Sequence, residues 1–112
     1  MSKTDNLAGA LEYLAMASLR QGPNHGFAIA ALIHRESDEV LRVEAGSLYP
    51  ALHRMTEAGL LRAEWKTSEA GRRARYYSLT PKGRKQLEAG EKRWLAVSAA
   101  IVKILKPAQG TV

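Results

Sequence analysis

The feature that most constrains the fold is a change in hydrophobic period near residue 60, which reverses near residue 80. Before residue 60, apolar side chains recur at helical spacing. Residues 61–67 then alternate, as a half-buried strand does, and residues 73–79 form a second, aromatic-rich strand after a turn that contains Gly71. Helical spacing returns from Pro81. This order predicts helices, then a two-stranded hairpin, then a final helix.

The first two helices are bounded by a cap and a break. Asp5 or Asn6 can cap a helix that runs to about Arg20, and the Gln-Gly-Pro-Asn segment at residues 21–24 interrupts it. A second helix is expected over residues 26–36. Its expected core residues are Phe27, Ala31 and Leu32.

The third helix is expected to begin around residues 45–47 and to continue to Ala58. Pro50 should lie in or near its first turn, where a missing N–H costs little. Gly59 can take the left-handed conformation that ends a helix. The expected inward residues are Leu48, Leu52 and Met55.

The last helix starts at a hydroxyl cap, Thr80, with a proline at its first position, and runs to about Lys106, before Pro107. About 26 residues at a rise of 1.5 Å give roughly 39 Å, which is too long for so small a domain to cover. An apolar stripe follows this helix, in which Gly90 could permit the close approach of another helix. We therefore expect a homodimer. The expected interface residues are Leu11, Leu14, Leu87, Trp94, Val97, Ile101 and Ile104.

Three helices, a hairpin and a further helix, in this order, match the winged helix-turn-helix, an α+β fold that is mostly α-helical. The 112 residues can hold one such domain and one appended helix. We expect the winged-helix domain over residues 1–80, a dimerisation helix over 81–106 and a tail over 107–112. In this fold the third helix is placed to enter a major groove, which is about 12 Å wide.

The positive charge is concentrated in the middle of the chain. The whole sequence has a formal net charge of +6, and residues 46–84 alone carry eight basic and three acidic side chains, a net charge of +5. This segment contains the expected third helix and the hairpin. The coincidence favours a nucleic-acid site over an ordinary solvated basic face.

Several classes of function are disfavoured by what the sequence lacks. It contains no cysteine, which excludes disulfides, cysteine-ligated zinc and thiol catalysis and fits a reducing cytosol. Its three histidines have no metal-ligand spacing, and no phosphate-binding or dinucleotide-binding glycine pattern occurs. No apolar run approaches a membrane span, and residues 1–6 do not begin a signal peptide. We expect no catalytic residue, metal, cofactor or membrane partner.

Four stretches together resemble the PadR-type transcriptional regulators. The resemblance covers about residues 7–106, and its most specific stretch is 71–83. One departure is Phe27, where the family usually has tyrosine. The four stretches are GPNHGF at 22–27, GSLYPALHRM at 46–55, EAGLL at 57–61 and GRRARYYSLTPKG at 71–83.

The resemblance implies a cytoplasmic bacterial repressor that binds double-stranded DNA as a homodimer through paired long helices. The single C-terminal helix is similar to that of the short subfamily. Operator binding in such regulators is often sensitive to a small hydrophobic effector. A two-fold dimer should then prefer inverted half-sites about one helical turn apart.

The candidate DNA contacts come from the third helix and the hairpin. Arg54 is the candidate for groove contact, while Ser47, Tyr49 and His53 could reach phosphates near the start of the helix. The remaining candidates are Arg72 and Arg73, which could enter a minor groove from the hairpin turn, and Lys66 and Arg75, which could touch phosphates. The alternatives are packing for Tyr49 and exposed surface for His53 and the turn arginines.

Trp94 has two interpretations. It is either part of the core of a dimer interface or, with its symmetry mate, one wall of an apolar chamber that stacks a small planar ligand. Lys82 and Arg84 lie in the first turn of the last helix, where the helix dipole disfavours cations. Either a compensating group, for which DNA is one candidate, or simple tolerance of the charges would explain them. A winged-helix module that binds protein and not DNA remains the main alternative function.

Overall fold

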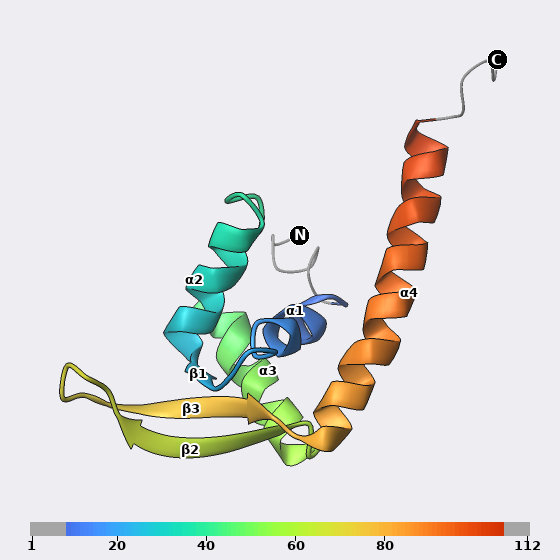
Figure 1. The fold of residues 1–112 in the computed structure, drawn as a ribbon. Coiled ribbons are helices and arrows are strands. Elements are labelled where there is room, and N and C mark those ends of the chain that lie inside the picture. Colours follow the sequence, from blue (N-terminus) through green and yellow to red (C-terminus); the bar gives the residue numbers. More distant parts are fainter. Residues whose placement is uncertain (1–8, 107–112) are drawn as a thin grey trace.

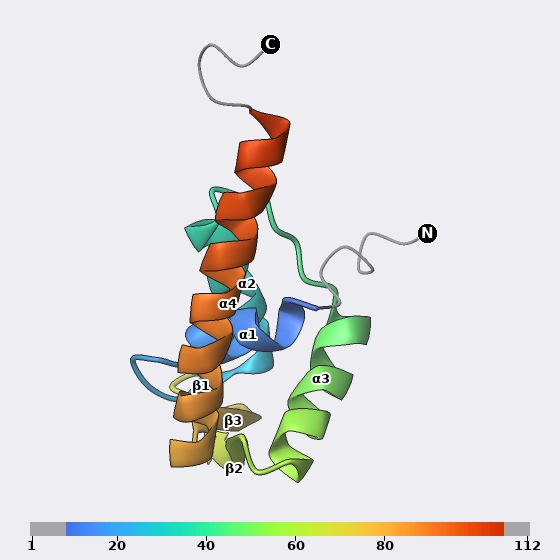
Figure 2. The same ribbon diagram turned by 90° about the vertical axis from the view of Figure 1, so that its right-hand side faces the viewer.

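Three short helices pack against a small sheet, and a long fourth helix rises away from them (Figures 1 and 2). The computed structural model describes residues 9–106. In chain order the elements are α1 (Leu11–Ala17), β1 (Asn24–His25), α2 (Gly26–Glu36), α3 (Ala45–Glu57), β2 (Leu61–Thr67), β3 (Arg73–Leu79) and α4 (Pro81–Leu105). The predicted α+β, mainly helical winged-helix architecture is confirmed.

The sheet is antiparallel, with strand order β1-β3-β2. In the hairpin, Leu61 pairs with Leu79 and Thr67 with Arg73, so the predicted strands are confirmed at both ends. The strand β1 was not predicted, because two residues are too few to show a period. It pairs His25 with Tyr76 and so joins the start of α2 to the hairpin.

The core lies where α1, α2 and α3 meet the first half of the hairpin. Leu48, Leu52 and Met55 are buried, as predicted for the inward face of α3. The other large residues of the core include Leu11, Met16, Leu19, Ile29, Ile33, Leu60, Leu61, Tyr77 and Leu87. Tyr77 is the buried aromatic ring of the hairpin, whereas Trp65, further out on β2, is 59% exposed. The hairpin therefore leaves the core halfway along its length.

Two expectations for the first helices were wrong. The helix α1 ends at Ala17 and not near Arg20, while the expected caps Asp5 and Asn6 lie outside the described residues. The bounds of α2 are as predicted, but its buried face is formed by Ile29 and Ile33.

Phe27, Ala31 and Leu32 were expected in the core of α2. Phe27 is 76% exposed, Ala31 is exposed and Leu32 is half-buried. Positions 27 and 31 lie about 200° around the helix from positions 29 and 33, so burial of one pair exposes the other. The sequence shows two candidate stripes and does not say which one faces the core.

The bounds of α3 agree with the prediction, but Pro50 is its sixth residue and lies in the second turn. A proline there cannot donate to the Gly46 carbonyl, which lies in an exposed turn where water can replace the donor. Gly59 has φ +79° and ends the helix, as predicted. The next residue, Leu60, closes the end through an N–H bond to the Met55 carbonyl at 2.9 Å.

The start of α4 is held by its predicted cap. The Thr80 hydroxyl accepts from the Gly83 N–H at 3.0 Å and donates to the Gly59 carbonyl at 2.6 Å. Further along, Tyr13 of α1 packs on Gly90, where any Cβ would overlap the tyrosine ring. The expectation that Gly90 permits close approach of a helix is confirmed.

Beyond Trp94, α4 leaves the rest of the chain and gives the molecule its extent of 61 × 27 × 26 Å (Figure 1). Every described residue from Leu95 onward is exposed. Across residues 9–106, no helix combines the length and apolar character needed to cross a bilayer.

Candidate nucleic-acid interface

The start of α3, the start of α2 and the turn of the hairpin lie on the side of the molecule away from α4 (Figure 1). On α3, Tyr49 and His53 are exposed one turn apart, and Ser47 is half-buried. Around the helix, Tyr49 lies about 60° and His53 about 100° from the buried Leu52, so Tyr49 borders the buried face. Ser47 lies about 160° from Tyr49, on the side of Arg54. The amphipathic pattern of α3 thus fixes which face meets solvent.

Tyr49 is both exposed and packed. Its side chain is 47% exposed, but one edge of the ring lies on Gly26, where a Cβ would approach ring atom Cε1 to 2.5 Å. Glycine at position 26 therefore lets the starts of α2 and α3 come together. Part of Tyr49 packs and part remains open to a ligand.

Arg54 is not brought together with Tyr49. Five residues further along α3, it points about 140° away around the helix. Its guanidinium lies 3.4 Å from the Glu12 carboxylate of α1, in a pair that is exposed and so weak. Arg54 therefore lies at the α1 side of this surface.

The basic residues of the hairpin divide between its two faces. Strand pairing places Arg75 opposite Trp65, and Arg73 lies with its guanidinium carbon 5.6 Å from the centre of the Trp65 ring. Lys66 projects from the other face, with Nζ 5.6 Å from the centre of the Tyr76 ring. Arg72 is exposed in the turn itself. The hairpin therefore presents positive charge on both faces and at its tip.

Sequence reasoning missed His25 as a structural residue at this surface. Its Nδ1 accepts the Ala28 N–H at 3.2 Å and so caps α2, and its ring meets Tyr76 edge-on at 5.3 Å. Serine, threonine, aspartate and asparagine are the usual caps, so a histidine gives little signal. Its place directly before Gly26, at the start of a predicted helix, was the available clue.

Lys82 has a partner within the chain. Its ammonium group donates to the Ala58 carbonyl at 2.8 Å, at the C-terminal end of α3. That end carries the negative pole of the helix dipole, which compensates the cation. Lys82 therefore ties the two helices together, while Arg84 is exposed.

Leu11 and Leu87, two of the expected interface residues, are in the core of the single chain. They are buried because α1 and the first turns of α4 cover each other. Leu14 and Trp94 are half-buried, and Trp94 lies against Gly9. Val97, Ile101 and Ile104 are exposed, so the open apolar face begins beyond the tryptophan.

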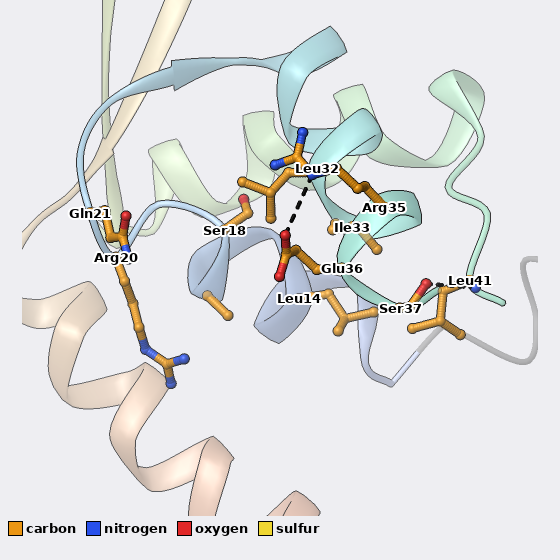
Figure 3. A pocket seen from close by; sticks show the side chains of 11 residues that line it. Leu14, Ser18, Arg20, Gln21, Leu32, Ile33, Arg35, Glu36, Ser37 and Leu41 are labelled. Atoms are coloured by element: carbon orange, nitrogen blue, oxygen red, sulfur yellow. Dashed lines mark hydrogen bonds and ion pairs between the residues drawn. The ribbon is translucent and has the colours of Figure 1, made fainter. Parts of the chain in front are cut away.

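A groove of about 490 Å³ lies between α1 and α2 (Figure 3). Its apolar lining residues are Leu14, Ala17, Leu32, Ile33 and Leu41, and its polar ones are Ser18, Arg20, Gln21, Arg35, Glu36 and Ser37. Arg20 reaches from it to pair with Glu91 of α4. Trp94 does not line this groove. Within residues 9–106, no three histidine, aspartate or glutamate side chains gather as a metal site would require.

A family model and several solved structures indicate one family. The model of the transcriptional regulator PadR-like family matches residues 15–89. Over 77 residues, 69% of this chain, the sequence is 42% identical to an uncharacterized 37.1 kDa protein in a transposon of Streptomyces fradiae. The chain spans only 21% of that relative's length.

Solved structures show the same fold along nearly the whole chain. A PadR-like transcriptional regulator from Bacillus cereus has a TM-score of 0.78 at 29% identity, with 96% of this chain and 100% of that chain covered. A PadR family regulator from Eggerthella lenta has a TM-score of 0.72 at 28% identity, with 93% and 88% covered. A transcriptional regulator from Clostridium thermocellum shares the fold at a TM-score of 0.81 and 24% identity, with 95% and 100% covered.

This family is one of transcriptional regulators and not of enzymes. The family model covers α2, α3 and the whole hairpin, together with parts of α1 and α4. The chain belongs to the PadR-like family of transcriptional regulators.

Proposed function

We propose that this chain binds double-stranded DNA as a homodimer and represses transcription from an inverted-repeat operator. The observation that carries the proposal is that the start of α3, the start of α2 and the turn of the hairpin lie on one side of the molecule, away from α4 (Figure 1). In winged-helix proteins these are the elements that meet DNA. Ser47, Tyr49 and His53 would contact phosphates, Arg54 a groove, and Lys66, Arg72, Arg73 and Arg75 the flanking backbone or minor groove.

The proposed dimer rests on the free end of α4. Residues 1–80 would form the DNA-binding domain and residues 81–106 the dimerisation helix, with 107–112 as a tail outside the described residues. Leu95, Val97, Ile101, Val102, Ile104 and Leu105 are all exposed along α4. So many apolar side chains on one projecting helix are typical of an interface. A partner helix would cover them.

The resemblance supports repression and control by an effector, and the position of Trp94 supports the effector alone. It lies where α4 leaves the domain, so an aromatic ligand stacked between Trp94 and its mate would change the spacing of the two heads. Such a ligand would be small, planar and hydrophobic. Binding to chromosomal DNA in a bacterium would place the protein in the cytoplasm.

Selection of bound duplexes from a random pool tests this function with the purified protein. We expect an inverted repeat with half-site centres about one helical turn apart. If each protomer neutralises about three to five phosphates, the binding constant should fall steeply with salt, by roughly the 0.9 power per phosphate. Absence of salt-dependent binding to any duplex would instead indicate a module that binds protein.

A further inference from the structure

On the proposed DNA-facing side, Phe27 is a large apolar side chain whose exposure the core does not explain. It is 76% exposed, more than Trp65 or Tyr49, and lies in the first turn of α2. A phenylalanine so exposed contributes nothing to the core. Exposed aromatic rings at one place on a surface usually mark a contact site.

Phe27 is one end of a row of side chains that crosses four elements. Its ring stacks with His25 at 6.5 Å between centres and 19° between planes, and His25 meets Tyr76 edge-on at 5.3 Å. Lys66 then places its ammonium group 5.6 Å from the centre of the Tyr76 ring. We call Phe27, His25, Tyr76 and Lys66 the aromatic ladder.

The aromatic ladder is held in place from within the chain. His25 is fixed twice, by the bond from the Ala28 N–H to Nδ1 and by its pairing with Tyr76 across β1 and β3. Phe27 therefore stacks on a ring that has little freedom to turn. The fixed His25 ring would lose little entropy when the ladder binds a ligand.

The aromatic ladder also continues the surface of α3. Tyr49, in the second turn of α3, packs on Gly26, the residue between His25 and Phe27. One end of the ladder thus adjoins the start of the proposed recognition helix, and the other end is on the hairpin. The row therefore connects the start of α3 with the hairpin, the two elements proposed to meet DNA.

We propose that the aromatic ladder binds the deoxyribose-phosphate backbone of one DNA strand between those two grooves. This inference rests on the proposed function. The Phe27 ring would pack on the apolar C–H face of a deoxyribose, and Lys66 would pair with a neighbouring phosphate. Residues 46–84, the segment that contains Lys66 and Tyr76, carry a net charge of +5 and so favour a polyanion over a neutral protein surface.

One acidic residue bounds the site. Glu64 lies directly opposite Tyr76 in the hairpin and shares its face. A phosphate near Lys66 would also feel this carboxylate. The substitution Glu64→Gln should therefore raise the affinity for DNA by about two- to fivefold at low salt.

The test compares Phe27→Ala with the matched control Val40→Ala, since Val40 is 78% exposed and lies outside the ladder. For Phe27→Ala we expect about tenfold weaker binding to operator and to random duplex alike, from the lost apolar contact. The slope of log affinity against log salt should not change, because no charge is removed. Lys66→Gln should instead lower that slope by about one.

Hydroxyl-radical footprints separate direct contact from an indirect effect. Phe27→Ala should lose protection of the sugars on one strand of each half-site, whereas Val40→Ala should keep the wild-type pattern. The proposal is overturned if Phe27→Ala has the wild-type affinity and footprint while the wild-type protein binds DNA. It is also overturned if the substitution changes only the oligomeric state, since the row would then join two copies. If the wild-type protein binds no duplex, the proposed function fails as well.

Discussion

Gly83 and Gly46 have similar places in their helices but opposite roles. Gly83 is the third residue of α4, where a Cβ would overlap the Leu60 carbonyl oxygen, whereas a Cβ on Gly46, the second residue of α3, would meet no atom within 4 Å. We expect Gly83→Ala to lower the free energy of unfolding by about 2 kcal/mol or more, because backbone must move. Gly46→Ala should leave it unchanged or raise it by up to about 1 kcal/mol. Urea unfolding measures both.

The His25 cap of α2 can be tested by substitution. His25→Ala leaves the Ala28 N–H without its acceptor and should lower the free energy of unfolding by about 1 kcal/mol. His25→Asn supplies another acceptor and should recover much of that loss, although it also removes the ring contact with Tyr76. Equal losses for the two variants in urea unfolding would show that the ring contacts, and not the cap, stabilise this junction.

At the candidate site, the predictions from sequence failed most often for the surroundings of single side chains. Tyr49 and Arg72 were expected to contact DNA, and both side chains are exposed, although one edge of the Tyr49 ring packs on Gly26. Phe27 was placed in the core because its hydrophobicity carries no information about helix phase. Lys82 was left without a partner, since the Ala58 carbonyl belongs to an element 24 residues away.

Among the elements, the hairpin and α4 could be predicted almost to the residue. Each has a strong local signal: alternation with a glycine turn in the first, and a Thr-Pro cap followed by a long helical stripe in the second. The strand β1 has no such signal, because it exists only through its pairing with β3. The end of α1 at Ala17 was also not predicted, because the break that the sequence marks, at residues 21–24, comes after it.

The hairpin turn carries a prediction about DNA. Arg72→Ala and Arg73→Ala should each weaken operator binding about three- to tenfold at physiological salt and lower the salt slope by about one, if each arginine neutralises one phosphate. Arg35→Ala is the matched control, because Arg35 is exposed at the end of α2 and pairs with Glu36, 3.4 Å away. Fluorescence anisotropy over a salt series measures all three variants. If both variants keep the wild-type slope of log affinity against log salt, the hairpin turn does not contact DNA.

At the scale of the whole molecule, the sequence indicated a surplus of apolar surface but not where it begins. A stripe at helical spacing runs from Leu87 to Ile104, and only the fold shows that α1 covers its first part. Tyr13 on Gly90 and the buried Leu87 belong to the single chain, while the residues beyond Trp94 have no cover within residues 9–106. The length of α4 was therefore informative about assembly, and the assignment of each residue was not.

This division predicts different behaviour for two substitutions on the same helix. Ile101→Glu places a charge on the exposed stripe and should dissociate the proposed dimer without unfolding the domain, since Ile101 is 51% exposed. Leu87→Ala removes core packing and should lower stability by about 2–4 kcal/mol but leave the dimer stripe intact. Sedimentation velocity and the urea unfolding midpoint, each measured over a range of protein concentrations, distinguish the two variants. If the folded chain dimerises, a higher protein concentration favours the folded dimer and raises the midpoint. The wild-type midpoint should rise with concentration, and that of Ile101→Glu should not.

Operator affinity of Ile101→Glu should fall steeply, because one head alone contacts only one half-site. A wild-type midpoint independent of concentration, with a monomer in sedimentation, would contradict the proposed dimer.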